Sequence, residues 1–430
     1  MKKAIILFIM IILFIPLFVA DARGNEVTQL QQEMTALRSQ FSEMKMSYET
    51  RIAQLETKIE DLQKTYSIRA QTPQIAPPVQ PQSTSLGRYF QSFNPDVSVI
   101  GDFTYHTTDK KGEDFRNQFN MRETELAFSA SVDPYARGDF FFALHQEGNE
   151  WHFHLEEGYL TLLTLPIEGL QAKVGQFRSE FGKANKYHFH NLPWVDYPNI
   201  VTNYLGEEGM MQPGVSASYL IPNPWNKYIE LTGQIFNNRN DESFGGSNGK
   251  DLIYLGHLKT FFDINEESTI ELGSSLAAGS NTESHGKFGK DMTALEGVDL
   301  TYKWKPLKQG LYKSLTFQNE LLLSQKDRPY FDDGTDIVEG KQLNSWGAYS
   351  SLSYQFAKRW TAFGRYDFSE FPDYTKNREN AYSLGLTFAQ SEYCLWRLQF
   401  KRTNRNFDKD ENAVWLQCDF GLGPHRKHEY

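Results

Sequence analysis

The dominant feature of this chain is a repeated alternation of apolar and polar residues that begins near Val97 and continues almost to the C-terminus. Successive side chains of a strand point to opposite faces of a sheet, so each alternating stretch predicts a strand with one apolar and one polar face. Turn residues separate the stretches. The pattern predicts about sixteen strands, with cores near residues 96–107, 119–132, 138–147, 152–164, 169–178, 212–221, 227–236, 251–262, 268–278, 291–304, 313–324, 345–356, 359–369, 379–389, 392–403 and 412–422.

The connections between these predicted strands fall into two classes. Those after even-numbered strands are mostly short, whereas several after odd-numbered strands are longer and more polar, namely 179–211, 237–250, 279–290 and 325–344. An even number of strands with short turns at one rim and long loops at the other is typical of an outer-membrane barrel. We therefore predict an all-β fold, a transmembrane antiparallel β-barrel of about 16 strands over residues 89–430. A soluble sandwich would also alternate, but it would bury its apolar face in a single core.

The alternation also predicts which face meets lipid. In the fifteenth predicted strand, Trp396, Leu398 and Phe400 share one face, and Arg397, Gln399 and Lys401 share the other. Aromatic residues near strand ends are expected at the two interfaces of the outer membrane. The stretch 154–159 breaks the alternation, and the sequence does not assign its faces.

Three further segments precede the predicted barrel. Lys2 and Lys3, an apolar run and an Ala-x-Ala site ending at Ala22 predict a signal peptide over 1–22, with an uncleaved anchor as the alternative. Apolar residues at alternating spacings of three and four from Val27 to Tyr66 predict a coiled-coil stalk over 23–69, which we place in the periplasm. A helix lying on a membrane is the other interpretation. Residues 70–88 form a Pro/Gln-rich linker.

Composition excludes several classes of protein. Only 40% of residues are hydrophobic and the mean hydropathy is −0.55, which does not fit a bundle of membrane-spanning helices. A formal net charge of −10 argues against a nucleic-acid partner. Two cysteines are too few for a disulfide scaffold. If the last hairpin turns near Asn406, Cys394 and Cys418 face each other; the pattern does not decide whether they are bonded.

The architecture, together with the segments Glu125–Phe128, Asp133-Pro134 and Leu170–Phe177, resembles the phosphate-selective porin O and P family. This resemblance implies a trimeric diffusion pore in the outer membrane of a Gram-negative-type bacterium, with loop 179–211 folded inward as a constriction. The ladder of arginines that such a phosphate pore implies is not found in the sequence. The His-rich segment Tyr187–Trp194 is also similar to proteins labelled as zinc-regulated or TonB-dependent outer-membrane receptors, but the chain is too short for 22 strands and a plug domain.

Charged residues on the predicted polar faces are candidates for lining a pore. We expect this role for Glu123, Glu125, Lys173, Arg359, Arg365, Arg397 and Lys401, beside other polar-face groups such as Asp102, His106, Asp139, Glu147, His257 and Lys259. Acids gather on the first three strands and cations on the thirteenth and fifteenth. Such a distribution predicts a transverse field that orients polar solutes. The alternative is a lumen that is polar only because it holds water.

Five histidines lie close in sequence and are candidate metal ligands: His145, His152, His154, His188 and His190. Two His-Phe-His triplets place paired imidazoles on one face of an extended strand, about 7 Å apart. Neutral imidazole binds zinc or copper, and Glu147, Glu150 and Glu156 could complete a coordination shell. Loop histidines that contact other residues or water are the alternative.

Three hypotheses for function follow. The first is a porin-like channel for small polar solutes or ions. The second is an uptake barrel selective for a metal such as zinc or for a small ligand, and the third is a structural protein that tethers the envelope. The sequence shows no recognisable Ser/His/Asp triad, so we expect no enzyme. We expect no cofactor apart from the zinc ion that the histidines could bind.

Overall fold

The computed structural model describes residues 95–112, 116–147, 150–240, 242–245, 251–281, 292–328, 331–332, 337–338 and 341–423. The predicted signal peptide, coiled coil and linker lie outside these residues. Among the residues that are described, no helix is both long and apolar enough to cross a membrane.

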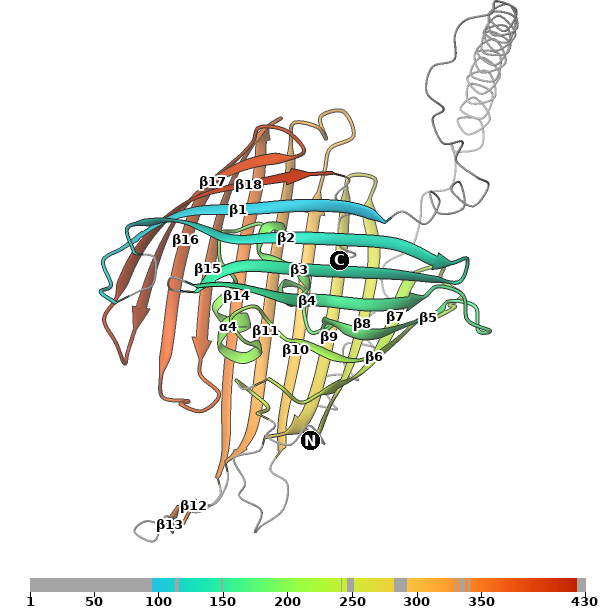
Figure 1. Cartoon of the computed structure of the whole chain (residues 1–430), viewed down its shortest axis with the longest axis horizontal. Coiled ribbons are helices and arrows are strands. Elements are labelled where there is room, and N and C mark those ends of the chain that lie inside the picture. The colour runs from blue at the N-terminus through green and yellow to red at the C-terminus, as the bar shows by residue number, and fades with distance from the viewer. Residues whose placement is uncertain are drawn as a thin grey trace, which may run out of the picture. The chain divides into compact units, whose positions relative to one another are not determined.

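Sixteen antiparallel strands close into a barrel, in which β1 pairs with β2 on one side and with β18 on the other (Figure 1). The first eight strands are β1 (Asp96–Thr108), β2 (Gln118–Asp133), β3 (Ala136–Glu147), β4 (Glu150–Leu162), β5 (Leu170–Arg178), β6 (Met211–Leu220), β7 (Tyr228–Asn237) and β8 (Leu252–Asn265). The others are β9 (Ser268–Ser280), β10 (Met292–Trp304), β11 (Ser314–Arg328), β14 (Lys341–Ala357), β15 (Trp360–Glu370), β16 (Arg378–Ala389), β17 (Cys394–Arg405) and β18 (Glu411–Leu422). A short hairpin, β12 (Phe331–Asp332) and β13 (Ile337–Val338), lies in the connection from β11 to β14.

The predicted barrel fold is confirmed, with each of the sixteen predicted segments corresponding to one barrel strand. Val99 pairs with Leu422, so the first strand begins and the last strand ends at the same rim. Tight connections such as 134–135, 266–267 and 358–359 lie at this short-turn rim. The opposite, long-loop rim carries the connections 179–210, 238–251 and 329–340.

The two faces of the barrel wall differ as the alternation predicts. On β17, the outward Trp396, Leu398 and Phe400 are exposed, whereas the inward Arg397 and Gln399 are buried. Other strands repeat this arrangement, with outward apolar residues that include Trp346, Leu352, Tyr354, Trp360, Leu384, Leu416 and Phe420. An apolar outer surface and a polar inner surface are what a barrel in lipid requires, because no water on the outside can solvate polar groups.

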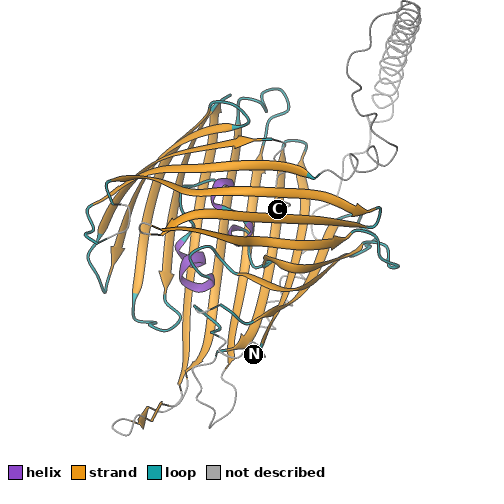
Figure 2. Cartoon of the chain, in the orientation of Figure 1, coloured by secondary structure: helices purple, strands orange, loops and turns teal. Residues whose placement is uncertain are grey.

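The long segment 179–210 between β5 and β6 folds into the barrel interior, as predicted for a constriction. It contains the short helices η1 (Ala184–Lys186), η2 (Phe189–Asn191) and α4 (Asn199–Leu205), which are seen inside the ring of strands in Figure 2. The hydrophobic core of the barrel is formed by this segment, which contributes Trp194 and Tyr204, and by inward side chains of the wall. The wall residues include Phe177, Phe236, Leu295, Leu322 and Tyr349.

The expected opposition of Cys394 and Cys418 is wrong. Cys394 pairs with Phe420 and Cys418 pairs with Trp396, so the hairpin from β17 to β18 is centred one residue later than Asn406. Both cysteines are free thiols. A shift of the hairpin centre by one residue moves each partner by two positions, so both cysteines stay on the outward face as diagonal rather than directly opposed neighbours.

Candidate functional site

The candidate functional site is the contact between segment 179–210 and the inner wall of the barrel. On one side, its first part is bound to β9 and β11. The Lys183 Nζ atom lies 2.7 Å from a Glu271 carboxylate oxygen on β9. The backbone N–H of Ala184 donates to Glu320 on β11 at 2.6 Å. Lys183 and Glu320 are buried and Glu271 is half-buried, and these contacts with carboxylates fix the segment where it enters the lumen.

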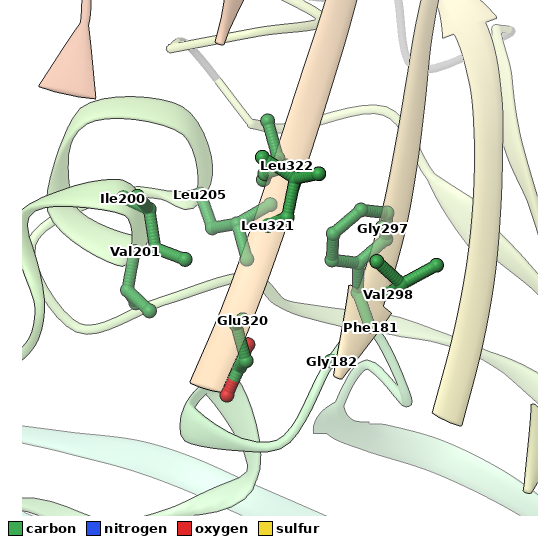
Figure 3. Close-up of a pocket in the computed structure, with 10 residues that line it drawn as sticks. All are labelled: Phe181, Gly182, Ile200, Val201, Leu205, Gly297, Val298, Glu320, Leu321 and Leu322. Atoms are coloured by element: carbon green, nitrogen blue, oxygen red, sulfur yellow. The ribbon is translucent and has the colours of Figure 1, made fainter. Parts of the chain in front are cut away.

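Two glycines make this close approach possible. Gly182 has a φ of +65°, and a Cβ added there would lie 2.4 Å from a Glu320 oxygen, so a larger residue is both strained and obstructed. Gly297 on β10 gives space to the ring of Phe181, which a Cβ would meet at 2.9 Å. A small pocket lies here between Phe181, helix α4 and the wall strands β10 and β11, with Ile200 and Leu322 among its lining residues (Figure 3).

Asp196 binds the segment to β15 and β17. Its carboxylate lies 3.1 Å from Arg365 Nη2 and 2.6 Å from Lys401 Nζ, and it accepts a hydrogen bond from Gln399 at 2.6 Å. Arg365 also pairs with Asp367 at 2.8 Å. Burial raises the pKa of Asp196, but the two cations lower it more, so the pKa lies below its usual range. Asp196 is therefore ionised at neutral pH and neutralises wall cations.

Backbone carbonyls of the segment bind two further arginines. Arg397 on β17 donates to the carbonyls of Leu192 and Trp194, each at 2.9 Å. Arg122 on β2 donates to the Val195 carbonyl at 2.6 Å and pairs with Asp102. These guanidinium groups satisfy carbonyls that the irregular backbone leaves without secondary-structure partners.

Of the predicted pore-lining residues, some are buried on the inner wall, some are half-buried and one, Arg359, is exposed in a turn. Arg365, Arg397, Glu123 and Glu125 are buried on the inner wall, and Lys401 is half-buried there. Lys173 is half-buried with its Nζ atom 5.2 Å from the centre of the Tyr159 ring.

Arg359 requires a correction. It lies in the exposed two-residue turn between β14 and β15 rather than on the wall. The predicted strand began one residue too early, and the turn takes up that residue.

A β-bulge explains why the alternation fails in β4. Phe141 of β3 pairs with Glu157 while Phe142 pairs with Leu155, so Glu156 is the extra residue of the bulge. Glu156 and Glu157 are consecutive, yet both are buried inside the barrel. The bulge thereby delivers two neighbouring carboxylates to the lumen, which a regular strand cannot do.

These carboxylates surround His188 from segment 179–210, whose side chain is completely buried. Its Nδ1 atom lies 3.0 Å from Glu125 Oε2 and 3.1 Å from Glu156 Oε2. Its Nε2 atom lies 2.6 Å from Glu157 Oε1. Burial and the Arg178 guanidinium lower the pKa of His188, but Glu156 and Glu125 outweigh them and raise it well above its usual value.

The remaining predicted histidines extend this group. His190 Nδ1 lies 3.8 Å from Glu125 Oε2 and 3.9 Å from Glu123 Oε1. The ligand atoms of His154, Glu156 and Glu208 lie within 4.8 Å of one another. The His145 ring centre is 4.9 Å from that of His154 and 5.8 Å from that of His152. His154, His188 and His190 therefore lie beside carboxylates, and His145 and His152 join the group through ring contacts with other histidines.

The sequence did not single out Glu157, Arg178, Asp196 and Glu208 as members of this site. Glu157 and Arg178 form a pair at 4.0 Å, and the Arg178 N–H donates to Glu157 Oε2 at 3.0 Å. The consecutive Glu156-Glu157 in a strand of broken alternation was the available signal for the bulge. Of the suggested supporting acids, Glu150 is exposed at the long-loop end of β4.

Comparisons with known proteins support the fold. No family model matches the chain. A protein of Aquifex aeolicus (strain VF5) described as uncharacterized is 28% identical over 400 residues, covering 79% of this chain and 81% of that one.

Solved structures of outer-membrane proteins share the architecture. The outer membrane channel DcaP of Acinetobacter baumannii is 13% identical with a TM-score of 0.51, covering 76% of this chain and 96% of that chain. OprB of Pseudomonas putida is 10% identical with a TM-score of 0.52, covering 79% and 96%. OmpTdeltaL8, a loop-deletion mutant of an outer membrane protein of Vibrio cholerae, is 8% identical with a TM-score of 0.50, covering 76% and 100%. At these identities the likeness concerns the fold.

Proposed function

We propose that this chain is an outer-membrane channel for small polar solutes or ions, and that segment 179–210 forms its constriction. The apolar outer face and the polar inner face support insertion in lipid around a polar lumen. The predicted signal peptide supports export. DcaP, which shares the fold, is described as an outer membrane channel.

The observation that carries this proposal is the attachment of segment 179–210 around the barrel. Its residues bind side chains of strands on many sides of the wall, namely β2, β4, β7, β9, β11, β14, β15 and β17. A segment bound to strands so widely separated in the barrel order must cross the lumen. Anything that passes through the barrel therefore passes beside this segment.

The lumen is lined by charges of both signs that pair with the segment. Arg365 and Lys401 face Asp196, and Arg397 faces backbone carbonyls, so these cations do not form a row open to solutes. This pairing favours selection by size and polarity at the constriction over a strong preference for one sign of charge. The narrower relation to the phosphate-selective porin O and P family remains a prediction, as does trimerisation through a periplasmic coiled coil.

Reconstitution of the full-length protein in planar bilayers tests the proposal. We expect discrete conductance steps that require folded protein. A matched preparation from cells that lack the gene controls for contaminating channels. Bilayers that stay silent, although heat-modifiable gel migration shows a folded barrel, would contradict the channel and favour the envelope tether.

A further inference from the structure

The group around His188 brings nitrogen and carboxylate donors together in a buried part of the lumen. Glu125 and Glu156 are each only 1% exposed, and His188 is completely buried. We propose that His188 Nδ1, Glu125 and Glu156 bind one divalent transition-metal cation of the zinc class. The binding site itself does not depend on the proposed channel function. Only the movement of the cation through the lumen rests on that function.

The spacing of the donor atoms fits such an ion. Two ligands of a tetrahedral zinc ion, each at about 2.0–2.1 Å, are separated by roughly 3.3 Å. The Glu125 and Glu156 oxygens lie 3.0 and 3.1 Å from His188 Nδ1. Side-chain shifts of a few tenths of an ångström would therefore convert these contacts into a coordination shell. Three protein ligands leave a fourth position for water or for a transported group.

The other side of the imidazole ring is already arranged as in a metal site. His188 Nε2 lies 2.6 Å from Glu157 Oε1, and the backbone N–H of Arg178 donates to the second oxygen of Glu157 at 3.0 Å. A carboxylate that accepts from one ring nitrogen leaves the lone pair of the other nitrogen for the metal. This arrangement orients Nδ1 toward Glu125 and Glu156.

The charge of the group also favours a cation. Glu123, Glu125, Glu156 and Glu157 are all buried, and the buried cation Arg178 contacts two of them, Glu156 and Glu157. Carboxylates thus outnumber permanent positive charges here, and carboxylates in a low-dielectric environment need compensation. A divalent ion would supply two positive charges at the position where His188 otherwise shares a proton with the surrounding carboxylates.

A route for the ion runs toward the long-loop rim. His154 and Glu208 are partly exposed and share Glu156 with the buried ligands. His145 contacts His154 and His152 in turn, toward the long-loop ends of β3 and β4. His190 and Glu123 lie on the other side of Glu125. Successive donor groups of this kind let an ion move between sites without complete desolvation.

Equilibrium titration of the metal-free full-length protein with Zn²⁺ in detergent tests the site. We expect one zinc ion per chain. Glu156→Gln and His188→Asn should weaken binding at least tenfold, because the first replaces a charged oxygen ligand with a neutral amide of the same shape and the second removes the imidazole ligand. His257→Asn is the matched control: His257 is a buried luminal histidine that bonds Ser275 and should bind zinc as the wild type does.

A second variant separates coordination from loss of structure. His188→Cys removes the imidazole hydrogen bonds but supplies a soft thiolate, so it should bind Cd²⁺ tightly where His188→Asn does not. Wild-type protein that binds no zinc, or variants at Glu156 and His188 that keep wild-type affinity, would overturn the metal site. Zinc binding is measured in detergent and conductance in a bilayer, so the two proposals can fail independently. A channel that conducts but binds no zinc would contradict only the metal site, and a protein that binds zinc but does not conduct would contradict only the channel.

Discussion

Replacing Asp196 with asparagine should loosen segment 179–210 from one side of the lumen. The substitution keeps the shape of the side chain but removes the charge that pairs with Arg365 and Lys401. Each hydrogen bond to a charged group contributes about 1.5–3 kcal/mol. In the variant, Arg365 still pairs with Asp367, and solvent screens the contacts of Asp196 because its side chain is 22% exposed. Losing the contacts with Arg365 and Lys401 should therefore destabilise the bound segment by about 2–3 kcal/mol in total.

A cost of this size shifts the balance between the bound and the released segment by about 30- to 150-fold. Single-channel recording should show this shift as more frequent transitions to higher-conductance states. Asp410→Asn is the control, because Asp410 pairs with Arg402 in an exposed salt bridge and should leave the recordings unchanged. Recordings of Asp196→Asn that match those of Asp410→Asn and the wild type would refute the role of this ion pair.

Three other perturbations give separate expectations. Trp194→Ala empties a fully buried site at a cost of about 3–5 kcal/mol and should speed tryptic cleavage of the folded barrel within 179–210, whereas lipid-facing Trp346→Ala should not. The stabilisation from ionised Asp196 is fully present above its unfolded pKa, near 3.8, and is lost as the pH falls through its lower folded pKa. Conductance should therefore show no Asp196-dependent change between pH 7 and pH 5 and should rise only in stronger acid. Deleting residues 27–66 should weaken the predicted trimer on semi-native gels while the barrel stays folded, and a trimer unchanged by the deletion would contradict the coiled-coil role.

The barrel was predictable from sequence because its rule is local. Apolar and polar side chains must alternate along a barrel strand in lipid. The immediate neighbours of residues such as Trp396 and Arg397 therefore predict which face each side chain lies on. Hairpin register is less well defined. The position of the last turn depends on loop geometry, and an error of one residue in its centre misplaced Cys394 relative to Cys418.

The site was only partly predictable because it depends on tertiary contacts. The histidines were found from their spacing, but the convergence of His188 with Glu125 requires the long segment to fold back across the lumen. The broken alternation near Glu156 signals an irregular strand, but which residue is the extra one follows only from the pairing of β4 with β3. Asp196 gave no signal at all, because its wall partners Arg365 and Lys401 follow it by more than 160 residues.

Single-channel conductance after removal of the inward segment tests the central claim most directly. Residues 184–204 would be replaced by a short Gly-Ser linker in the full-length chain, with removal of the β12–β13 hairpin, residues 331–338, as the matched control at another long loop. If segment 179–210 is the constriction, its removal should raise conductance and admit larger solutes, and the control should conduct as the wild type does. Conductance and solute exclusion that stay unchanged after removal of 184–204 would contradict the account.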